Sequence, residues 1–153
     1  MIIIGYQGIG KSTLAKNRLD IIDFESGWTK VEGKRDLNWG KTYAQMAEGL
    51  SRQGYIVFVA SHFCVQEALL KSKEIVYAIF PALELKNEWI TKLHERWNSS
   101  GLEKDRLAYL DAYMSYEQEI KILMGNFPEK NAIILEKDYD LARMIEEIAK
   151  IYA

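Results

Sequence analysis

Residues 2–13, Ile-Ile-Ile-Gly-Tyr-Gln-Gly-Ile-Gly-Lys-Ser-Thr, begin as a short β-branched run and pass directly into a glycine-rich stretch. The run is typical of a buried strand, and the residues after it match the phosphate-binding loop pattern G-x-x-x-x-G-K-[S/T]. The fixed positions of this pattern are Gly5, Gly10, Lys11 and Ser12. A helix is predicted directly after the loop, which gives the strand–loop–helix order that such loops require.

The residue types in this loop suit a polyphosphate. Glycines admit positive φ angles and let successive backbone N–H groups approach phosphate oxygens. The N-terminal end of the following helix adds partial positive charge. We expect Lys11 to bind the β- and γ-phosphates of ATP and Ser12 to bind Mg²⁺. The predicted nucleotide contacts are Gly5, Gln7, Gly8, Ile9, Gly10, Lys11, Ser12 and Thr13. The alternative interpretation is a glycine-rich surface turn beside a lysine.

The composition favours one globular domain. The chain has 153 residues, of which 48% are hydrophobic and 27% are charged, and these values are ordinary for a soluble protein of this size. A net charge of −2 argues against nucleic acid held by a basic surface. The single cysteine, Cys64, fits a reducing compartment. With no apolar run long enough for a membrane span and no room for a signal peptide before Ile2, we expect a cytoplasmic protein.

Apolar β-branched runs alternate with segments of helical periodicity along the rest of the chain. After the first strand, further strands are predicted at Ile21–Ile22, Tyr55–Ala60, Glu74–Phe80 and Ala132–Leu135. Helices are predicted at about 13–20, 43–53, 61–71, 86–97, 102–124 and 141–149. This alternation predicts a single α/β domain over residues 1–153, in which a five-stranded parallel sheet is flanked by helices on both sides.

Local signals predict two further details of these elements. Pro81 is expected to end the fourth strand, because proline lacks the N–H group that a strand ladder uses. In the long helix at 102–124, one mostly apolar stripe is expected from Leu107, Leu110, Met114, Glu117, Ile120 and Met124. This stripe is the predicted buried face of the helix.

Polar residues follow three of the predicted strands where each strand ends. The glycine-rich loop follows strand one, Asp23 and Glu25 follow strand two, and Ser61 and His62 follow strand three. Ligands of open α/β sheets bind at the carboxyl ends of the strands. These residues are therefore expected to converge on one site.

With the loop, the acidic pair after strand two and a basic helical stretch late in the chain, the sequence resembles the P-loop kinases of small molecules. Within them it resembles the nucleoside monophosphate kinases, and it is most similar to small nucleotide-kinase-like proteins often encoded by bacteriophages. The stretches that carry the closer resemblance are Ile22–Ser26, Phe58–His62, and Phe80-Pro81 followed by Leu85–Trp89. The resemblance implies a P-loop NTPase fold with an acceptor-binding segment at about 28–40 and a mobile helical lid at about 86–106.

The resemblance also implies roles for individual residues. Lys11 and Ser12 take the phosphate and Mg²⁺ roles, and Asp23 holds a Mg²⁺-bound water or the attacking oxygen. Arg96 and Arg106 lie in the segment that matches the lid, where arginines close over the transferring phosphoryl group. Guanidinium groups suit phosphoryl oxygens well because they are planar and permanently charged. The predicted catalytic residues are therefore Lys11, Asp23, Arg96 and Arg106, and the predicted metal ligands are Ser12 and Asp23.

The predicted acceptor contacts are Asp23, Glu25, Lys34, Arg35 and His62. Each also has a structural interpretation, as a solvated charge, a loop cap or a packing residue. Trp28 and Trp39 either stack on a base or cover the core. The chain departs from the family at the end of strand three, where adenylate and thymidylate kinases usually place an arginine that grips the acceptor phosphate.

The leading functional hypothesis is transfer of the γ-phosphoryl group of ATP, with Mg²⁺, to a nucleoside or deoxynucleoside monophosphate. A second hypothesis is a P-loop kinase of a small-molecule hydroxyl, similar to shikimate or gluconate kinases, in which Asp23 orients the hydroxyl. A third is a nucleotide-binding module that regulates a partner without turnover. The expected partner is a small-molecule nucleotide rather than a membrane or a nucleic acid, and the sequence leaves the oligomeric state open.

Overall fold

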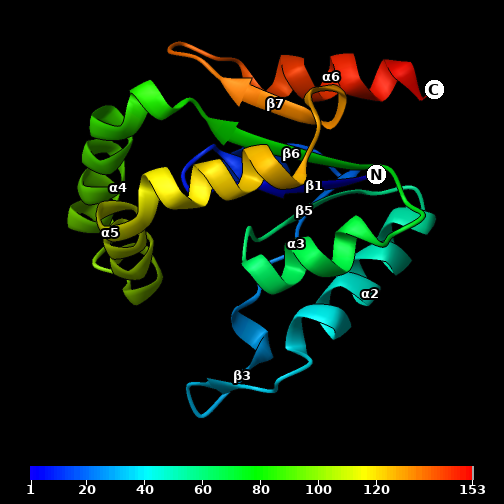
Figure 1. The fold of residues 1–153 in the computed structure, drawn as a ribbon, viewed down its shortest axis with the longest axis horizontal. Coiled ribbons are helices and arrows are strands. Elements are labelled where there is room, and N and C mark those ends of the chain that lie inside the picture. The colour runs from blue at the N-terminus through cyan, green and yellow to red at the C-terminus, as the bar shows by residue number, and fades with distance from the viewer. Residues whose placement is uncertain (153) are drawn as a thin grey trace.

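A five-stranded, all-parallel sheet lies at the centre of the computed structural model, which describes residues 1–152 (Figure 1). The strand order is β2-β5-β1-β6-β7. The strands are β1 (Ile2–Gly5), β2 (Ile21–Asp23), β5 (Ile56–Val59), β6 (Val76–Pro81) and β7 (Ala132–Leu135). The predicted α/β fold with five parallel strands is confirmed.

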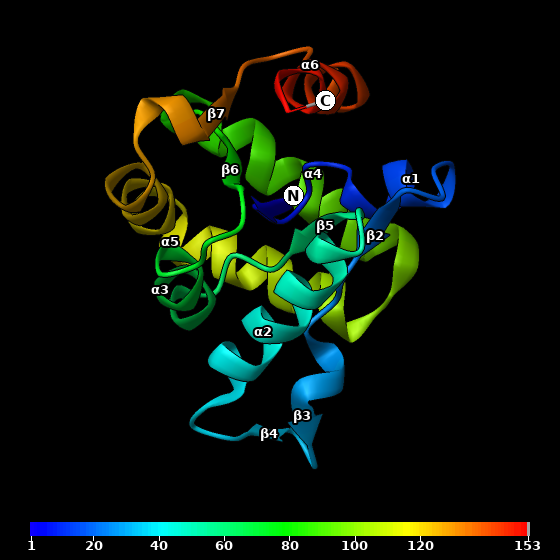
Figure 2. The ribbon, with the colours of Figure 1, turned by 90° about the vertical axis from the view of Figure 1, so that its right-hand side faces the viewer.

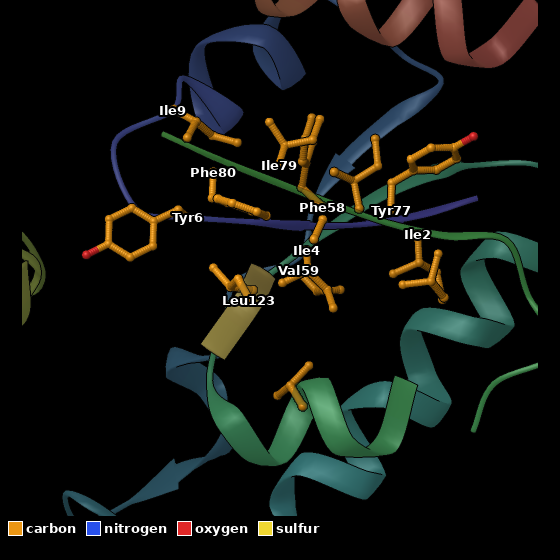
Figure 3. Packing of buried hydrophobic residues seen from close by; sticks show 14 of the residues in the cluster. Ile2, Ile4, Tyr6, Ile9, Phe58, Val59, Tyr77, Ile79, Phe80 and Leu123 are labelled. Atoms are coloured by element: carbon orange, nitrogen blue, oxygen red, sulfur yellow. The ribbon is translucent and has the colours of Figure 1, made fainter. Parts of the chain in front are cut away.

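The central strand β1 is buried along its whole length. It pairs with β5 on one side and β6 on the other, and Ile2, Ile3 and Ile4 are all 0% exposed. Unbroken β-branched runs suit this position because both faces of a parallel sheet are covered by helices. Figure 3 shows side chains of β1, β5 and β6 in one buried cluster, together with Tyr6 and Ile9 of the loop that follows β1.

Helices cover both faces of the sheet, as predicted. The helices are α1 (Lys11–Lys16), α2 (Trp39–Arg52), α3 (Phe63–Leu70), α4 (Lys86–Ser100), α5 (Glu103–Asn126) and α6 (Leu141–Ile151). The pair α2 and α3 lies on one side of the sheet and α6 on the other (Figures 1 and 2). The chain turns from α4 into α5 at Gly101, whose φ of +65° is a left-handed conformation that glycine adopts without strain.

A short hairpin occupies much of the segment predicted to bind the acceptor. It consists of β3 (Lys30–Val31) and β4 (Lys34–Arg35), which pair antiparallel. Figure 2 shows the hairpin projecting away from the sheet, beside the start of α2. No strand was predicted in residues 28–40, because two-residue strands carry too short an alternation to be recognised, and α2 already begins at Trp39.

Of the apolar stripe predicted for α5, only Ile120 is buried. Met114 is 80% exposed and Met124 is 44% exposed. The buried face consists of Asp105, Ala108, Ala112, Tyr116, Ile120 and Leu123. Helices α4 and α5 pack against each other, with Tyr109 of α5 beside His94 and Trp97 of α4. Counting large apolar residues therefore selected the wrong face.

Pro81 was predicted to stop β6 at Phe80. It belongs to the strand instead, as its last residue, and pairs with Leu135 of β7. On the other side of β6, Ile79 is the last residue to pair with β1, and its carbonyl accepts from the N–H of Tyr6. Residues two apart in a strand point to the same side, so the nitrogen of Pro81 faces the side where β1 has already ended. No ladder bond is lost there.

We predict opposite effects for two glycine substitutions in α2. An alanine Cβ at Gly40 would lie 2.7 Å from the Cys64 sulfur, whereas a Cβ at Gly49 meets no atom within 4 Å. Gly40→Ala is expected to lower the free energy of unfolding by about 1–3 kcal/mol through overpacking. Gly49→Ala should raise it by about 0.5–1 kcal/mol through helix propensity. Urea denaturation measures both, and equal effects would contradict the close contact between α2 and α3.

Candidate functional site

The loop after β1 holds a run of backbone amides that have no acceptor. Among the described residues, the N–H groups from Gln7 to Thr13 donate to no carbonyl and to no side chain. Gly8 and Gly10 have φ angles of +86° and +104°, and the residues next to them have negative φ. Such alternation turns successive N–H groups toward a common point and forms an anion-binding concavity.

The carbonyl groups of the same loop are held by two aromatic side chains. The indole N–H of Trp89 donates to the Gln7 carbonyl at 2.8 Å, and the Tyr139 hydroxyl donates to the Ile9 carbonyl at 2.9 Å. The two rings stack with their centroids 6.0 Å apart, and a Cβ at Gly8 would lie 3.2 Å from the indole nitrogen. Helix α4 therefore packs directly on the loop and fixes which way its peptides face.

Lys11 lies folded over the loop. Its Nζ donates to the Gly5 carbonyl at 2.9 Å, and a Cβ at Gly5 would lie 2.7 Å from the Lys11 Cδ. Burial lowers the pKa of Lys11, and the positive charge of Arg96 lowers it further, while Asp23 raises it. A side chain at position 5 would therefore crowd Lys11, whose ammonium group lies against the backbone at the start of the loop.

Asp23 lies at the end of β2, close enough to Lys11 for their charges to interact. Burial raises the pKa of Asp23, and the charge of Lys11 opposes that shift. Mg²⁺ bound to a nucleotide takes one or two protein oxygens and completes its shell with phosphates and water. The Asp23 carboxyl and the exposed Ser12 hydroxyl are oxygen ligands that could supply these one or two protein contacts. Within residues 1–152 no cluster of three or more His, Cys, Asp or Glu is placed to hold a metal ion.

Arg96 reaches the site from the last turns of α4. Its Nε lies 3.0 Å from the Asp105 carboxylate, and its charge acts on both Lys11 and Lys92. Part of the predicted lid segment, about 86–106, belongs to the hydrophobic core and part extends beyond it. Trp89 and the fully buried Leu93 belong to the core, so only the end of α4 and the start of α5 extend beyond it.

Arg35 is brought to the end of β5 by the hairpin. Its guanidinium lies over the Trp39 ring, 4.2 Å from the centroid, and it donates to Thr29 Oγ1 at 2.8 Å and to Ser26 Oγ at 3.1 Å. Its Nη1 donates to no group in the described chain. The His62 and Trp39 rings meet edge to face with their centroids 5.0 Å apart, so Arg35 and His62 both contact one indole.

The other predicted acceptor and lid residues lie at the surface. Glu25 lies 3.4 Å from Lys104 at the start of α5, which joins the two segments flanking the site. Lys34 is exposed on the hairpin. Arg106 pairs with Glu103 at 2.5 Å. In the described part of the chain, no hydrogen bond or ion pair joins Arg106 to Lys11. Its catalytic role stays a prediction.

Sequence reasoning missed the residues that hold the site together. The hydroxyl of the buried Tyr43 donates to the Phe24 carbonyl and accepts from the Ala60 N–H at 3.0 Å, which ties the ends of β2 and β5. Trp89 and Tyr139 bond to a loop 82 and 130 residues away in the chain. No local pattern encodes such contacts, although a tryptophan in an otherwise charged helix was a weak signal for Trp89.

A cavity of about 200 Å³ lies between the start of α3 and the second half of α5. Asp111 and Glu119 of α5 line it opposite His62. Burial, with the charge of Asp111 adding to it, raises the pKa of Glu119 to about 7. Partial burial and the cations Arg35, Lys30 and Lys11 lower the pKa of His62 to about 4. The cavity therefore presents carboxyl groups and a neutral imidazole at neutral pH.

Comparison with protein-family models and with curated proteins found no match to this chain. No helix in residues 1–152 combines the length and apolar character needed to cross a membrane.

We predict that Glu119 makes folding stability fall as the pH rises through about 7. A glutamate in an unfolded chain titrates near pH 4.3, so the folded state binds this proton more tightly between about pH 4.5 and 7. Over that range the stability of the wild type minus that of Glu119→Gln should decrease. Chemical denaturation at several pH values measures it. Glu117→Gln, on the exposed side of α5, is the control and should show no such trend.

Proposed function

We propose that the protein is a P-loop phosphotransferase that moves the γ-phosphoryl group of ATP to a nucleoside or deoxynucleoside monophosphate. The observation that carries this proposal is the run of unpaired amides from Gln7 to Thr13, with the Lys11 ammonium beside it. Helix α1 has only 6 residues, so the loop amides and Lys11, rather than a helix dipole, supply the positive potential. Donors arranged in this way match a chain of phosphates.

The residues around Lys11 suit the charge that develops during phosphoryl transfer. Catalysis of this reaction consists mainly of positioning and electrostatic stabilisation. Lys11 and Arg96 neutralise charge on the transferring group, and Asp23 and Ser12 hold Mg²⁺. When bound there, Mg²⁺ would offset part of the phosphate charge.

Arg35 is proposed to bind the phosphate of the acceptor. The sequence places no arginine directly after β5, but the hairpin brings Arg35 to that end of the sheet, and its Nη1 is without a partner in the described chain. Stacking on Trp39 and the bonds to Thr29 and Ser26 hold the guanidinium in place. A preorganised cation loses little conformational entropy when a phosphate binds. A phosphate oxygen is itself nucleophilic, so no strong base is required.

A second candidate is transfer to a hydroxyl group. The observation that favours it is the raised pKa of Asp23 next to Lys11, because a carboxylate of raised pKa is a better proton acceptor. Release of ADP in the presence of nucleoside monophosphates, compared with polyols and sugar acids, separates the two candidates.

We predict that Lys11→Ala abolishes phosphoryl transfer without unfolding the protein. Loss of charge-assisted hydrogen bonds worth about 1.5–3 kcal/mol should weaken Mg·ATP binding roughly 10- to 150-fold. Isothermal titration calorimetry and an ADP-release assay measure the two effects. Lys16→Ala, at the exposed end of α1, is the control. Unchanged Mg·ATP affinity in the Lys11 variant would refute the proposed phosphate site.

We also predict that Arg35→Ala weakens binding of the acceptor but not binding of Mg·ATP. The acceptor KM should rise about 10- to 150-fold, on the same free-energy scale, while Mg·ATP affinity stays the same. Arg35→Lys should give an intermediate value, because an ammonium keeps the charge but loses the planar stack. Lys41→Ala, exposed on α2, is the matched control. An equal loss of ATP and acceptor affinity would show that Arg35 acts only through the fold.

A further inference from the structure

A carboxylate is buried where α4 turns into α5. Asp105, in the first turn of α5, is only 5% exposed. Its Oδ1 lies 3.0 Å from Arg96 Nε, and its Oδ2 accepts from the Ser100 hydroxyl at 2.5 Å. Aspartate is almost never buried to this extent unless it is paired. In the described part of the chain, Arg96 is the only cation that forms an ion pair with this carboxylate.

The turn between the two helices fixes the position of the carboxylate. The Ser100 hydroxyl that donates to it accepts in turn from the Leu102 N–H at 3.1 Å. Trp97, the residue after Arg96, stacks on Tyr109 of α5 with the ring centroids 5.8 Å apart. Helices α4 and α5 lie side by side (Figure 1). The packing of these helices therefore decides where the carboxylate lies and where it holds the guanidinium of Arg96.

Arg96 is one of three cations that act on each other at this end of the site. Burial lowers the pKa of Lys11 and of Lys92, and the positive charge of Arg96 lowers both further. Lys92 lies over the Trp89 ring, 4.3 Å from its centroid, and donates to the Tyr139 hydroxyl at 3.1 Å. Neither lysine forms an ion pair with a residue in 1–152. Because like charges repel, an Arg96 side chain without its carboxylate would move away from the lysines into water.

The pairing leaves most donors of the guanidinium free. Arginine carries five N–H donors in a rigid planar fork, and the Asp105 oxygen lies beside Nε. No hydrogen bond in residues 1–152 uses the Nη1 or Nη2 groups of Arg96. Its side chain is 43% exposed, so a ligand can reach these groups.

Resting on the proposed function, we propose that Asp105 is the positioning residue of Arg96, and that its buried carboxylate holds the guanidinium where charge develops during phosphoryl transfer. Donors that are already in place when charge develops need no reorganisation. A side chain that is already held also loses less conformational entropy when it binds a phosphoryl group. The residue roles expected from the sequence include Arg96 but not Asp105.

The competing interpretation is that Asp105 only stabilises the turn. A carboxylate in the first turn of a helix is favoured by the helix dipole whatever the protein does. A double-mutant cycle separates the two roles. Loss of a positioning residue has no further effect on kcat once Arg96 is absent, whereas loss of a structural residue has the same effect with Arg96 or without it.

The test compares kcat and the KM for Mg·ATP in the wild type, Asp105→Asn, Arg96→Ala and the double variant, with a nucleoside monophosphate as acceptor. Arg96→Ala should lower kcat by about 10³-fold, as for other arginines that stabilise a transferring phosphoryl group. Asp105→Asn should lower kcat about 10- to 100-fold, the size expected for a misplaced group. The KM for Mg·ATP should stay nearly the same, because Lys11 and the loop amides bind the nucleotide. The double variant should match Arg96→Ala.

Two further variants control for charge and for folding. Glu95→Gln removes a carboxylate next to Arg96 in the chain that is exposed and forms no ion pair in residues 1–152, and it should leave kcat unchanged. Ser100→Ala loosens the Asp105 carboxylate without changing any charge, and it should lower kcat by less than Asp105→Asn does. It also tests the proposal if the Asp105 variant does not fold, and circular dichroism checks folding at the assay temperature.

Exchange of the Arg96 Nε proton with water provides a measurement that needs no substrate. In the wild type, NMR should show slower exchange for Arg96 than for Arg52, whose ion pairs are exposed and use Nη1. Asp105→Asn should bring the Arg96 rate close to that of Arg52. Equal rates in the wild type would show that Asp105 does not hold Arg96 and would overturn the proposal.

The kinetic outcomes distinguish this inference from the proposed function. Unchanged kcat in Asp105→Asn, or an equal loss with and without Arg96, overturns the positioning role while the kinase function survives. Absence of phosphoryl transfer by the wild type to any nucleoside monophosphate overturns the proposed function, and the positioning role falls with it.

Discussion

A run of backbone N–H groups without acceptors, from Gln7 to Thr13, is the constraint on which the rest of the structure depends. Proteins pair nearly all their backbone amides, because an unpaired buried amide costs free energy comparable to a lost hydrogen bond. This loop leaves a consecutive set open and places a lysine ammonium beside them. One polyphosphate could satisfy all of these donors at once, whereas water must do so in its absence.

Packing decides which way the loop peptides face. Trp89 and Tyr139 donate hydrogen bonds to the loop carbonyls of Gln7 and Ile9. The amide hydrogens of the loop therefore remain on its open side. The same tryptophan belongs to the hydrophobic core, and α4 is thereby fixed against the loop. Preorganised donors need no rearrangement when charge develops, which is the main source of electrostatic catalysis. Stability of the core and geometry of the site are thus properties of one set of contacts.

Opposite charges are separated across the site. Lys11, Arg35 and Arg96 gather where phosphate groups are proposed to meet, and Asp111 and Glu119 line the inner cavity. An anionic group is attracted to the cationic half and repelled by the carboxylates, whereas hydrogen-bond donors are attracted to the carboxylates.

The sequence by itself determined the parallel sheet, the glycine-rich loop and the place of Asp23, because β-branched runs and glycine spacing act through neighbours in the chain. It did not determine which face of α5 is buried, since Ala112 is buried and Met114 exposed for reasons of helix contact rather than hydrophobicity. Only the tertiary structure brought Arg35 to the end of β5 and Trp89 to the loop. Side-chain contacts across long stretches of chain depend on how separate elements pack, and no local pattern records that packing.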